Sequence, residues 1–239
     1  MREFSVTPIR LGGRIAESSL FLHLTDMGRK ITIAYRLWVL RSGDRTVLVD
    51  TGPPMAEAKR RGITDIHGVR DALRDAGVDA ASVDTIVLTH LHWDHASNVS
   101  AFPAATFVAQ KAEVDFFHNP IREHSCFARF YSDEGALADL LKSGRVQSLD
   151  GDAAVEEGIE LLHVGGHTPG SQMIRVRTPE GWVILTGDAI PLNRNFLEGI
   201  PSGITSNLIE SAEVLERVAR LQPVAIYTGH DPVQALRVN

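Results

Sequence analysis

The chain has 239 residues, of which 44% are hydrophobic and 23% are charged, and its formal net charge is −6. This composition is typical of a globular protein with a full core, and the length predicts one domain over residues 1–239. The apolar runs are too short for a membrane span, and the scattered basic residues argue against nucleic acid as a partner.

The first half of the chain reads as strands followed by alternating helices and strands. Residues 31–40 and 46–49 are rich in β-forming side chains and flank a polar turn, which predicts a hairpin. The apolar run Ile86-Val87-Leu88 predicts a buried strand over 84–89. The other elements predicted here are a strand over 106–109 and helices over 65–76, 95–101, 111–117 and 135–142.

The second half repeats this order. A hairpin is predicted over 172–177 and 182–185, and residues 208–221 have the apolar spacing of an amphipathic helix. Further strands are predicted over 159–164 and 224–227. The repetition predicts two similar halves that pack sheet on sheet with helices outside.

Residues 118–134 combine Pro120, several charges and aromatic side chains, and we predict a surface excursion or lid there. The aromatic segment 116–131 and the segment 192–204 could wall a substrate pocket. The alternative is that the phenylalanines belong to the core or to an oligomer contact. They are Phe116, Phe117, Phe127 and Phe130.

The segment Thr89-His90-Leu91-His92-Trp93-Asp94-His95 follows a buried strand and holds three imidazoles and one carboxylate. Such groups suit zinc and similar divalent metals. A turn that leaves a strand end aims alternate side chains at one point, so His90 and His92 can share one metal. Asp94 and His95 can then face a second metal. The alternative is a solvated loop with incidental histidines.

Two metals need about three to four protein ligands each, so this motif cannot complete a site alone. Three further candidates each follow an apolar strand and have glycine beside them, which lets the backbone turn sharply. Each alone could be a structural polar residue, but together they favour a common site. They are His167, Asp188 and His230.

These motifs resemble the metallo-β-lactamase superfamily, whose hallmark is a His-x-His-x-Asp-His run followed by His, Asp and His on later strand ends. The resemblance covers nearly the whole chain and implies an αββα sandwich of two mixed β-sheets with outer helices. It also implies two divalent metal ions, which we expect to be zinc. The implied ligands are His90, His92 and His167 for the first metal, Asp94, His95 and His230 for the second, and Asp188 bridging both.

Asp50, in Val49-Asp50-Thr51-Gly52, matches a superfamily position that supports the ligands, and the alternative is a plain turn residue. Ligand histidines need their second ring nitrogen held, and Asp50, Thr89 and Asp231 are candidates for this. Two metals lower the pKa of a shared water, so we expect a metal-bridging hydroxide to attack a substrate carbonyl. Asp94 could accept and return a proton as the leaving group departs.

Within the superfamily, the chain is most similar to the N-acyl homoserine lactone lactonases and related small lactonases. The similarity lies in residues 88–96, 109–113, 166–170 and 185–189. We therefore expect a lactonase-like hydrolase of a small lactone or ester-like molecule. Those lactonases usually carry a tyrosine shortly after the bridging Asp. This chain has Ala189-Ile190-Pro191-Leu192 there, and its Tyr131 and Tyr227 lie elsewhere, so another lactone, ester or amide stays open.

Other members of the superfamily offer alternative functions. An iron-dependent sulfur dioxygenase shares the histidine-rich run, and a thioesterase of the glyoxalase II type stays open. His92 argues against flavodiiron oxygen reductases, which have glutamate in the run. The acidic balance and the absence of an added basic arm argue against a nuclease.

Cys126 is the only cysteine, so an intrachain disulfide is excluded, and without an evident base partner it is not predicted to be a nucleophile. Residues 1–13 lack the apolar stretch of a secretory signal, and we expect a cytoplasmic location. We expect a small-molecule substrate, no membrane partner and no nucleic acid, and we leave a homodimer open. His118, His124 and His163 are predicted not to be ligands.

Overall fold

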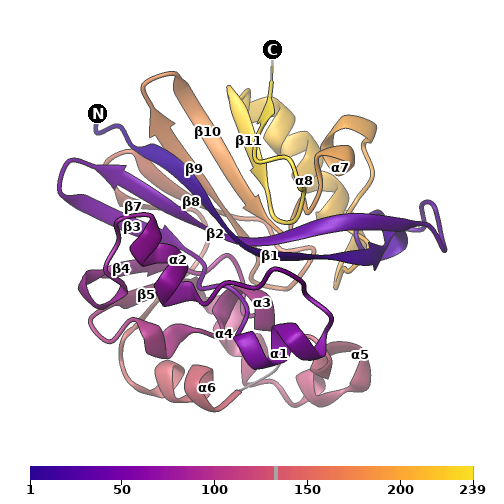
Figure 1. Ribbon diagram of the computed structural model, residues 1–239. Coiled ribbons are helices and arrows are strands. Elements are labelled where there is room, and N and C mark those ends of the chain that lie inside the picture. Colours follow the sequence, from indigo (N-terminus) through magenta and orange to yellow (C-terminus); the bar gives the residue numbers. More distant parts are fainter. Residues whose placement is uncertain (132–133, 239) are drawn as a thin grey trace. The chain divides into compact units, whose positions relative to one another are not determined.

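The computed structural model describes residues 1–131 and 134–238. The chain divides into two compact units, each built from segments that are distant in the sequence (Figure 1). Unit 1 comprises Met1–Phe4, Arg14–Ala34 and Asp150–Asn239, and unit 2 comprises Ser5–Gly13 and Tyr35–Leu149. This division does not test the prediction of one domain over 1–239, which stays a prediction.

The first of two six-stranded mixed sheets has the order β1-β2-β3-β4-β5-β6. Strands β2 and β3 form the predicted antiparallel hairpin, and β3 to β6 run parallel to one another. β4 lies between two neighbours, which explains its unbroken apolar run. The strands are β1 (Ser5–Glu17), β2 (Lys30–Ser42), β3 (Arg45–Val49), β4 (Thr85–Val87), β5 (Thr106–Gln110) and β6 (Val146–Leu149).

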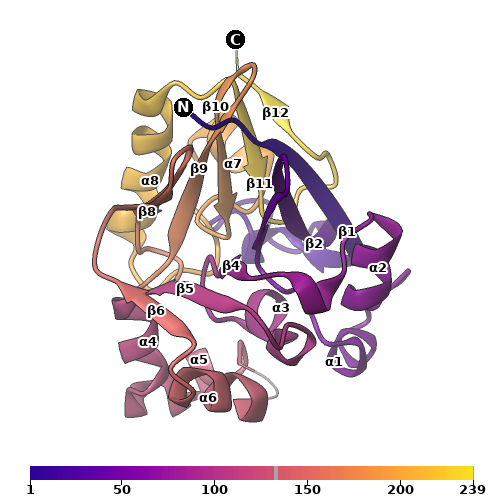
Figure 2. The same ribbon diagram turned by 90° about the vertical axis from the view of Figure 1, so that its left-hand side faces the viewer.

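Short helices of unit 2 pack on the parallel part of this sheet. Phe117 and Leu140 come from two of them and join the strand residues Ile86 and Phe107 in one core. Figure 2 shows α4 next to β5 and β6. The α-helices are α1 (Met55–Arg60), α2 (Val69–Asp75), α3 (Trp93–Ala96), α4 (Lys111–Phe117), α5 (Ser125–Ala128) and α6 (Glu134–Lys142). The 3-10 turns are η2 (Ala80–Ser82), η3 (Val99–Ala101) and η4 (Pro120–Glu123).

Unit 1 carries the second sheet, with the order β12-β11-β10-β9-β8-β7. β10 and β11 are parallel, and the other neighbours are antiparallel. The long helix α8 buries Val214 and Val218 against Met173 and Ile184 of the sheet (yellow in Figure 1). The strands are β7 (Ala153–Glu156), β8 (Ile159–His163), β9 (Gln172–Thr178), β10 (Gly181–Gly187), β11 (Ala225–Thr228) and β12 (Leu236–Arg237). The helices are η1 (Ser18–Leu20), α7 (Asn193–Glu198) and α8 (Leu208–Leu221).

The prediction of two mixed sheets with helices is confirmed, and the predicted bounds of α4 and α8 match the structure. Two predicted helices differ. The helix expected over 65–76 begins at Val69, because its N-cap Gly68 is extended with a ψ of 137° and Asp65 has a φ of 50°. The helix expected over 95–101 breaks after α3, where the Asn98 side-chain amide donates to the carbonyls of Thr51, Gly52 and Pro53.

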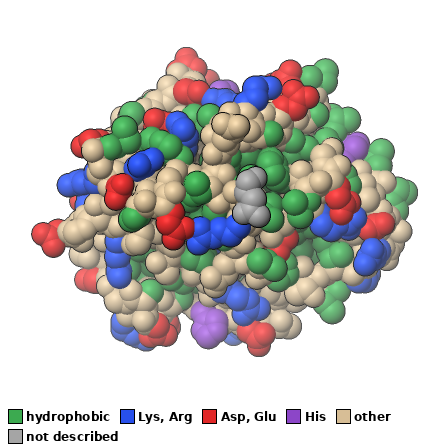
Figure 3. Space-filling view, turned by 90° about the horizontal axis from the view of Figure 1, so that it is seen from above, with side chains coloured by type: hydrophobic (Ala, Val, Ile, Leu, Met, Phe, Trp, Pro, Cys, Tyr) green, Lys and Arg blue, Asp and Glu red, His purple; other side chains and the backbone are tan. Residues whose placement is uncertain are grey.

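Within 118–134, the described residues form η4 and α5, and Ser132 and Asp133 lie outside the described residues. On the face drawn in Figure 3, acidic and basic side chains are interspersed. Within the described ranges, the helices are all too short or too polar to cross a membrane.

Candidate metal centre

Residues 88–92 connect β4 to α3. His92 is the N-cap of α3, with φ −67° and ψ 157°, which is an extended backbone. Along an extended chain, side chains two residues apart point the same way. His90 and His92 therefore share one side, and one ring nitrogen of each lies within 4.8 Å of the other.

The four candidate ligands of this turn are all buried. His90 is 1% exposed and Asp94, the most exposed of them, is only 8% exposed. Asp94 and His95 come from α3, and Oδ2 of Asp94 lies 3.8 Å from Nε2 of His95. The structure thus brings together all of the predicted ligands from unit 2.

Asp50 supports this turn from the end of β3. It is fully buried and adopts a φ of 64°, which turns its carboxylate toward the 89–95 segment. Oδ1 accepts the backbone N–H of Thr89 at 2.7 Å, and Oδ2 lies 2.7 Å from Nδ1 of His95. The Thr89 hydroxyl in turn lies 3.1 Å from Nδ1 of His90.

The predicted ligands of unit 1 form a second buried group. Each follows a strand of the second sheet: His167 follows β8, Asp188 follows β10 and His230 follows β11. Nε2 of His230 lies 3.0 Å from Oδ1 of Asp188, and Nε2 of His167 lies 3.6 Å from Oδ2 of the same carboxylate. Asp188 therefore contacts both histidines.

Glycines allow the close approach in unit 1. A Cβ on Gly229 would lie 2.6 Å from Oδ1 of Asp188. A Cβ on Gly166, whose φ is +76°, would lie 2.8 Å from the backbone nitrogen of Ser211. Real Cβ atoms do not approach other atoms so closely, so both positions need glycine.

Four of the candidate histidines have their Nδ1 atom held by an oxygen atom. The distances are 2.7 Å to Ile204 O for His167 and 2.8 Å to Ala34 O for His230. His90 and His95 have Thr89 and Asp50 in this position. An acceptor at Nδ1 fixes the tautomer in which Nε2 carries the lone pair, which is the usual arrangement of metal-ligating histidine. The donor set therefore fits divalent metal ions.

Two of the three residues predicted to hold a second ring nitrogen lie at these Nδ1 atoms. Asp50 lies against Nδ1 of His95, and Thr89 lies against Nδ1 of His90. The carboxylate of Asp231 accepts the backbone N–H groups of Asn193 and Val233, and Nδ1 of His230 lies against Ala34 O. A backbone carbonyl gives no signal in the sequence.

The aromatic segment contacts the histidine-rich turn 89–95. The ring of Phe130 stacks on His92 with 5.0 Å between centroids, and the ring of Tyr131 meets His92 edge-on at 5.3 Å. The carbonyl of Phe130 also accepts the N–H of Trp93 at 2.9 Å. These two aromatic residues therefore hold His92, a role that the sequence did not predict.

The role of Glu113 was also not predicted from the sequence. Its Oε1 accepts the N–H of Leu91 at 3.0 Å. Glu113 lies four residues before the core residue Phe117, on the buried side of α4. That helical spacing is the signal that could have found it.

The prediction that Cys126 lacks a base partner is wrong. Nδ1 of His124 lies 3.0 Å from its Sγ, because His124 caps α5 and the cap geometry brings the ring over the next turn. Both residues are exposed. The His163 ring contacts the carbonyl of Pro169 at 3.0 Å, in keeping with a structural role.

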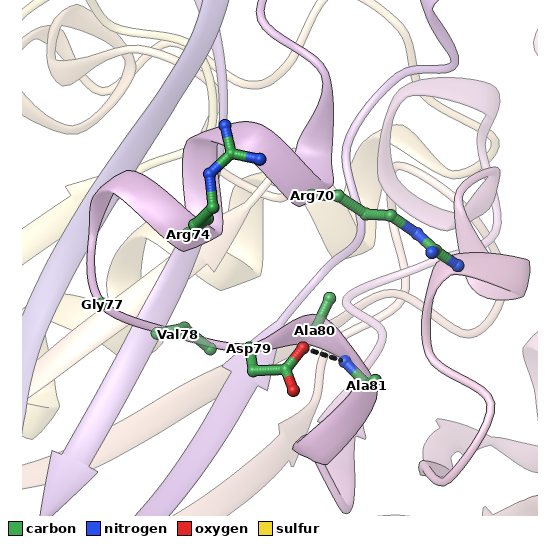
Figure 4. A pocket seen from close by; sticks show the side chains of 7 residues that line it. All are labelled: Arg70, Arg74, Gly77, Val78, Asp79, Ala80 and Ala81. Carbon is green, nitrogen blue, oxygen red and sulfur yellow. Dashed lines mark hydrogen bonds between the residues drawn. The ribbon is translucent and has the colours of Figure 1, made fainter.

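The cavity drawn in Figure 4 lies elsewhere in unit 2. It has a volume of about 450 Å³ and is lined by α2 and the residues that follow it. Arg74 forms an ion pair there with Asp71 at 2.8 Å, and Asp79 accepts the N–H of Ala81. The lining residues are Arg70, Arg74, Gly77, Val78, Asp79, Ala80 and Ala81, and they include none of the predicted ligands.

Known proteins share both the sequence pattern and the fold. Residues 36–230 match the family described as the metallo-beta-lactamase superfamily. An N-acyl homoserine lactonase of Bacillus sp is 27% identical over 221 residues, which cover 85% of this chain and 84% of that protein. The N-acyl homoserine lactonase AttM of Rhizobium radiobacter is 28% identical over 191 residues, covering 72% and 70%.

Solved structures share the fold at lower identity. A quorum-quenching N-acyl homoserine lactone lactonase superposes with a TM-score of 0.81 at 24% identity, covering 97% of this chain and 93% of that one. AidC, a dizinc quorum-quenching lactonase, superposes with a TM-score of 0.72 at 17% identity, covering 97% and 91%.

Proposed function

Because this chain belongs to the metallo-beta-lactamase superfamily, we propose that it is a metal-dependent hydrolase that opens a small lactone or a closely related ester. The curated relatives that carry the name N-acyl homoserine lactonase support the lactone. Their names do not favour the sulfur dioxygenase or glyoxalase II alternatives. The observation that carries the proposal is the buried set of histidines whose Nδ1 atoms are held, so that Nε2 is the ligand atom.

The proposed ligands would hold two divalent ions, with zinc as the preferred metal. Imidazole and carboxylate donors suit zinc, and a dizinc lactonase shares the fold. Two ions bound together supply a Lewis acid for the substrate carbonyl oxygen and lower the pKa of water. The proposed ligands are His90, His92 and His167 for the first ion, Asp94, His95 and His230 for the second, and Asp188 for both.

The side chains of this protein would orient the ligand histidines and transfer the proton. Asp50 and Thr89 keep His95 and His90 in the tautomer that binds metal. Asp94 is the proposed general base and acid. Its carboxylate accepts a proton as water adds to the carbonyl carbon, and returns it to the ring oxygen as the C–O bond of the lactone breaks. The product is the open hydroxy acid.

Pro191 belongs to the stretch 189–192, which lacks the tyrosine that the resembling lactonases usually carry shortly after the bridging Asp. Its carbonyl accepts the backbone N–H of His230 at 2.7 Å, so this segment holds a proposed ligand. A tyrosine hydroxyl that contacts the substrate carbonyl is therefore not supplied by this stretch. We propose a small lactone as the substrate class, without the acyl-homoserine group being required.

A hydrolysis screen tests the proposal. Zinc-loaded protein is assayed against lactones, thioesters, β-lactams and phosphodiesters, together with His92→Ala and the matched control His118→Ala, which changes an exposed histidine. We expect lactone opening that His92→Ala abolishes and His118→Ala preserves. Activity confined to phosphodiesters or thioesters would contradict the lactonase proposal.

A further inference from the structure

The carboxylate of Glu113 is buried directly behind the proposed metal-binding turn. Glu113 lies in the first turn of α4 and is only 1% exposed. Its Oε1 lies 3.0 Å from the backbone nitrogen of Leu91, the residue between His90 and His92. Burying a carboxylate is unfavourable unless it is hydrogen-bonded, so the choice of glutamate over an apolar residue at this position needs a reason.

The hydrogen bonds of the turn's backbone suggest that reason. The N–H groups of three alternate residues are each held by a group from a different part of unit 2. Thr89 donates to Asp50 at 2.7 Å, Leu91 to Glu113 at 3.0 Å and Trp93 to the Phe130 carbonyl at 2.9 Å. The side chains of His90 and His92 lie between these fixed points.

Glu113 is the middle one of the three acceptors. Of the three, it alone binds the residue that lies between His90 and His92 in the sequence. The peptide groups on either side of Leu91 set the distance and angle between the two rings, whose centroids lie 4.6 Å apart at 79°. A change in this segment would therefore move one ring relative to the other.

We propose that Glu113 is a positioning residue that fixes the relative placement of His90 and His92 for metal binding. The inference rests on the proposed function, since it assumes that these two histidines share a metal ion. Glu113 acts through the backbone of Leu91, so neither substrate nor metal needs to touch it.

The experiment compares Glu113→Ala and Glu113→Gln with the wild type and with Leu140→Ala. Leu140 is a buried core residue of α6, a helix that contributes no residue to the turn, so its variant controls for lost stability. The readouts are the zinc dissociation constant, the absorption spectrum of the cobalt-loaded protein and the unfolding of the metal-free protein. None of these readouts requires a substrate.

We expect Glu113→Ala to weaken zinc binding by about 10-fold to 100-fold, the usual effect of removing a group that supports a metal ligand. We also expect it to change the cobalt spectrum. Glu113→Gln keeps a carbonyl oxygen for the Leu91 N–H, and we expect it to recover most of the affinity. Leu140→Ala should lower the stability of the metal-free protein and leave both metal readouts unchanged.

Three results would overturn the proposal. They are zinc binding by Glu113→Ala at wild-type affinity, an equal loss in Leu140→Ala, and no recovery in Glu113→Gln. A wild-type protein that binds zinc at this turn but opens no lactone would contradict the proposed function alone, and the role of Glu113 would still be measured.

Discussion

Oδ2 of Asp50 lies 2.7 Å from Nδ1 of His95, although 45 positions separate the two residues in the sequence. The same carboxylate accepts the N–H of Thr89 through its other oxygen. One side chain thus connects the end of β3 to both ends of the turn 89–95, and it holds the tautomer of one proposed ligand.

Replacing Asp50 by Asn tests this link. Asn tolerates the positive φ at this position, so the backbone should be preserved while the charged acceptor for His95 is lost. We expect zinc affinity and lactonase activity to fall by about 10-fold to 100-fold. Metal content after dialysis and kcat/KM measure the effect, with Asp44→Asn in an exposed turn as the control. An unchanged metal content would show that Asp50 is only a turn residue.

Gly166→Ala should destabilise the protein. The new Cβ would lie 2.8 Å from the Ser211 backbone nitrogen, and the φ of +76° is unfavourable for alanine, so we expect a loss of about 1–3 kcal/mol. Gly199→Ala is the matched control, since its φ is +68° and its Cβ would meet no atom within 4 Å. Chemical denaturation of both variants separates the clash from the backbone strain. Equal losses would argue against a clash.

Removing the metals should lower the thermal stability. Ions that bind only the folded state at about 1,000 times their Kd stabilise it by about 4 kcal/mol, which corresponds to roughly 10 °C in Tm for a chain of this size. The measurement is a melting curve before and after chelation, with zinc added back as the control. His92→Ala should show a smaller change. A Tm that changes neither with chelator nor with added zinc would contradict the proposed centre.

Glu57 should give stability that depends on pH. Burial raises the pKa of its carboxyl group, but hydrogen bonds and charge from Arg60 and Arg61 outweigh this, so its pKa lies below the ordinary value of 4.5. A lowered folded-state pKa contributes stability that is present above pH 4.5 and lost as the pH falls through the folded-state value. Glu57→Gln should therefore be less stable than the wild type at pH 7, and the difference in stability should be smaller at pH 3.

Urea unfolding at the two pH values measures this gap. The control is Glu216→Gln, because Glu216 pairs with Arg220 at 3.4 Å on the surface and should contribute little at either pH. A gap of the same size at pH 3 and pH 7 would contradict the role assigned to the Glu57 carboxylate.

The sequence predicted the elements whose signal is local. The bounds of α8 match the prediction because its apolar spacing is regular and Asn207 caps its first turn. Strand β1 was missed because Pro8, Gly12 and Gly13 are typical of loops. The sheet order explains the exception, since β1 is an edge strand, where proline removes no needed hydrogen bond.

In the candidate site, too, some residues were predictable from the sequence and others were not. Histidine and aspartate at strand ends carry a strong signal, and the structure gathers the predicted ligands within each unit. Their partners are partly backbone carbonyls, such as Ile204 O at His167, and any residue could supply those. Phe130 and Tyr131 were predicted as pocket wall, and only tertiary structure places their rings on His92.

The contact between Ala34 and His230 affects how far the N-terminus can be truncated without disturbing the proposed site. The backbone N–H of Ala34 donates to the carbonyl of His230 at 2.9 Å, in addition to the contact between Ala34 O and Nδ1 of His230. The superfamily match starts at residue 36, just after this partner. A protein trimmed to the matched region would keep every proposed ligand and still lose the group that aims one of them, so homology boundaries would be a poor guide to truncation.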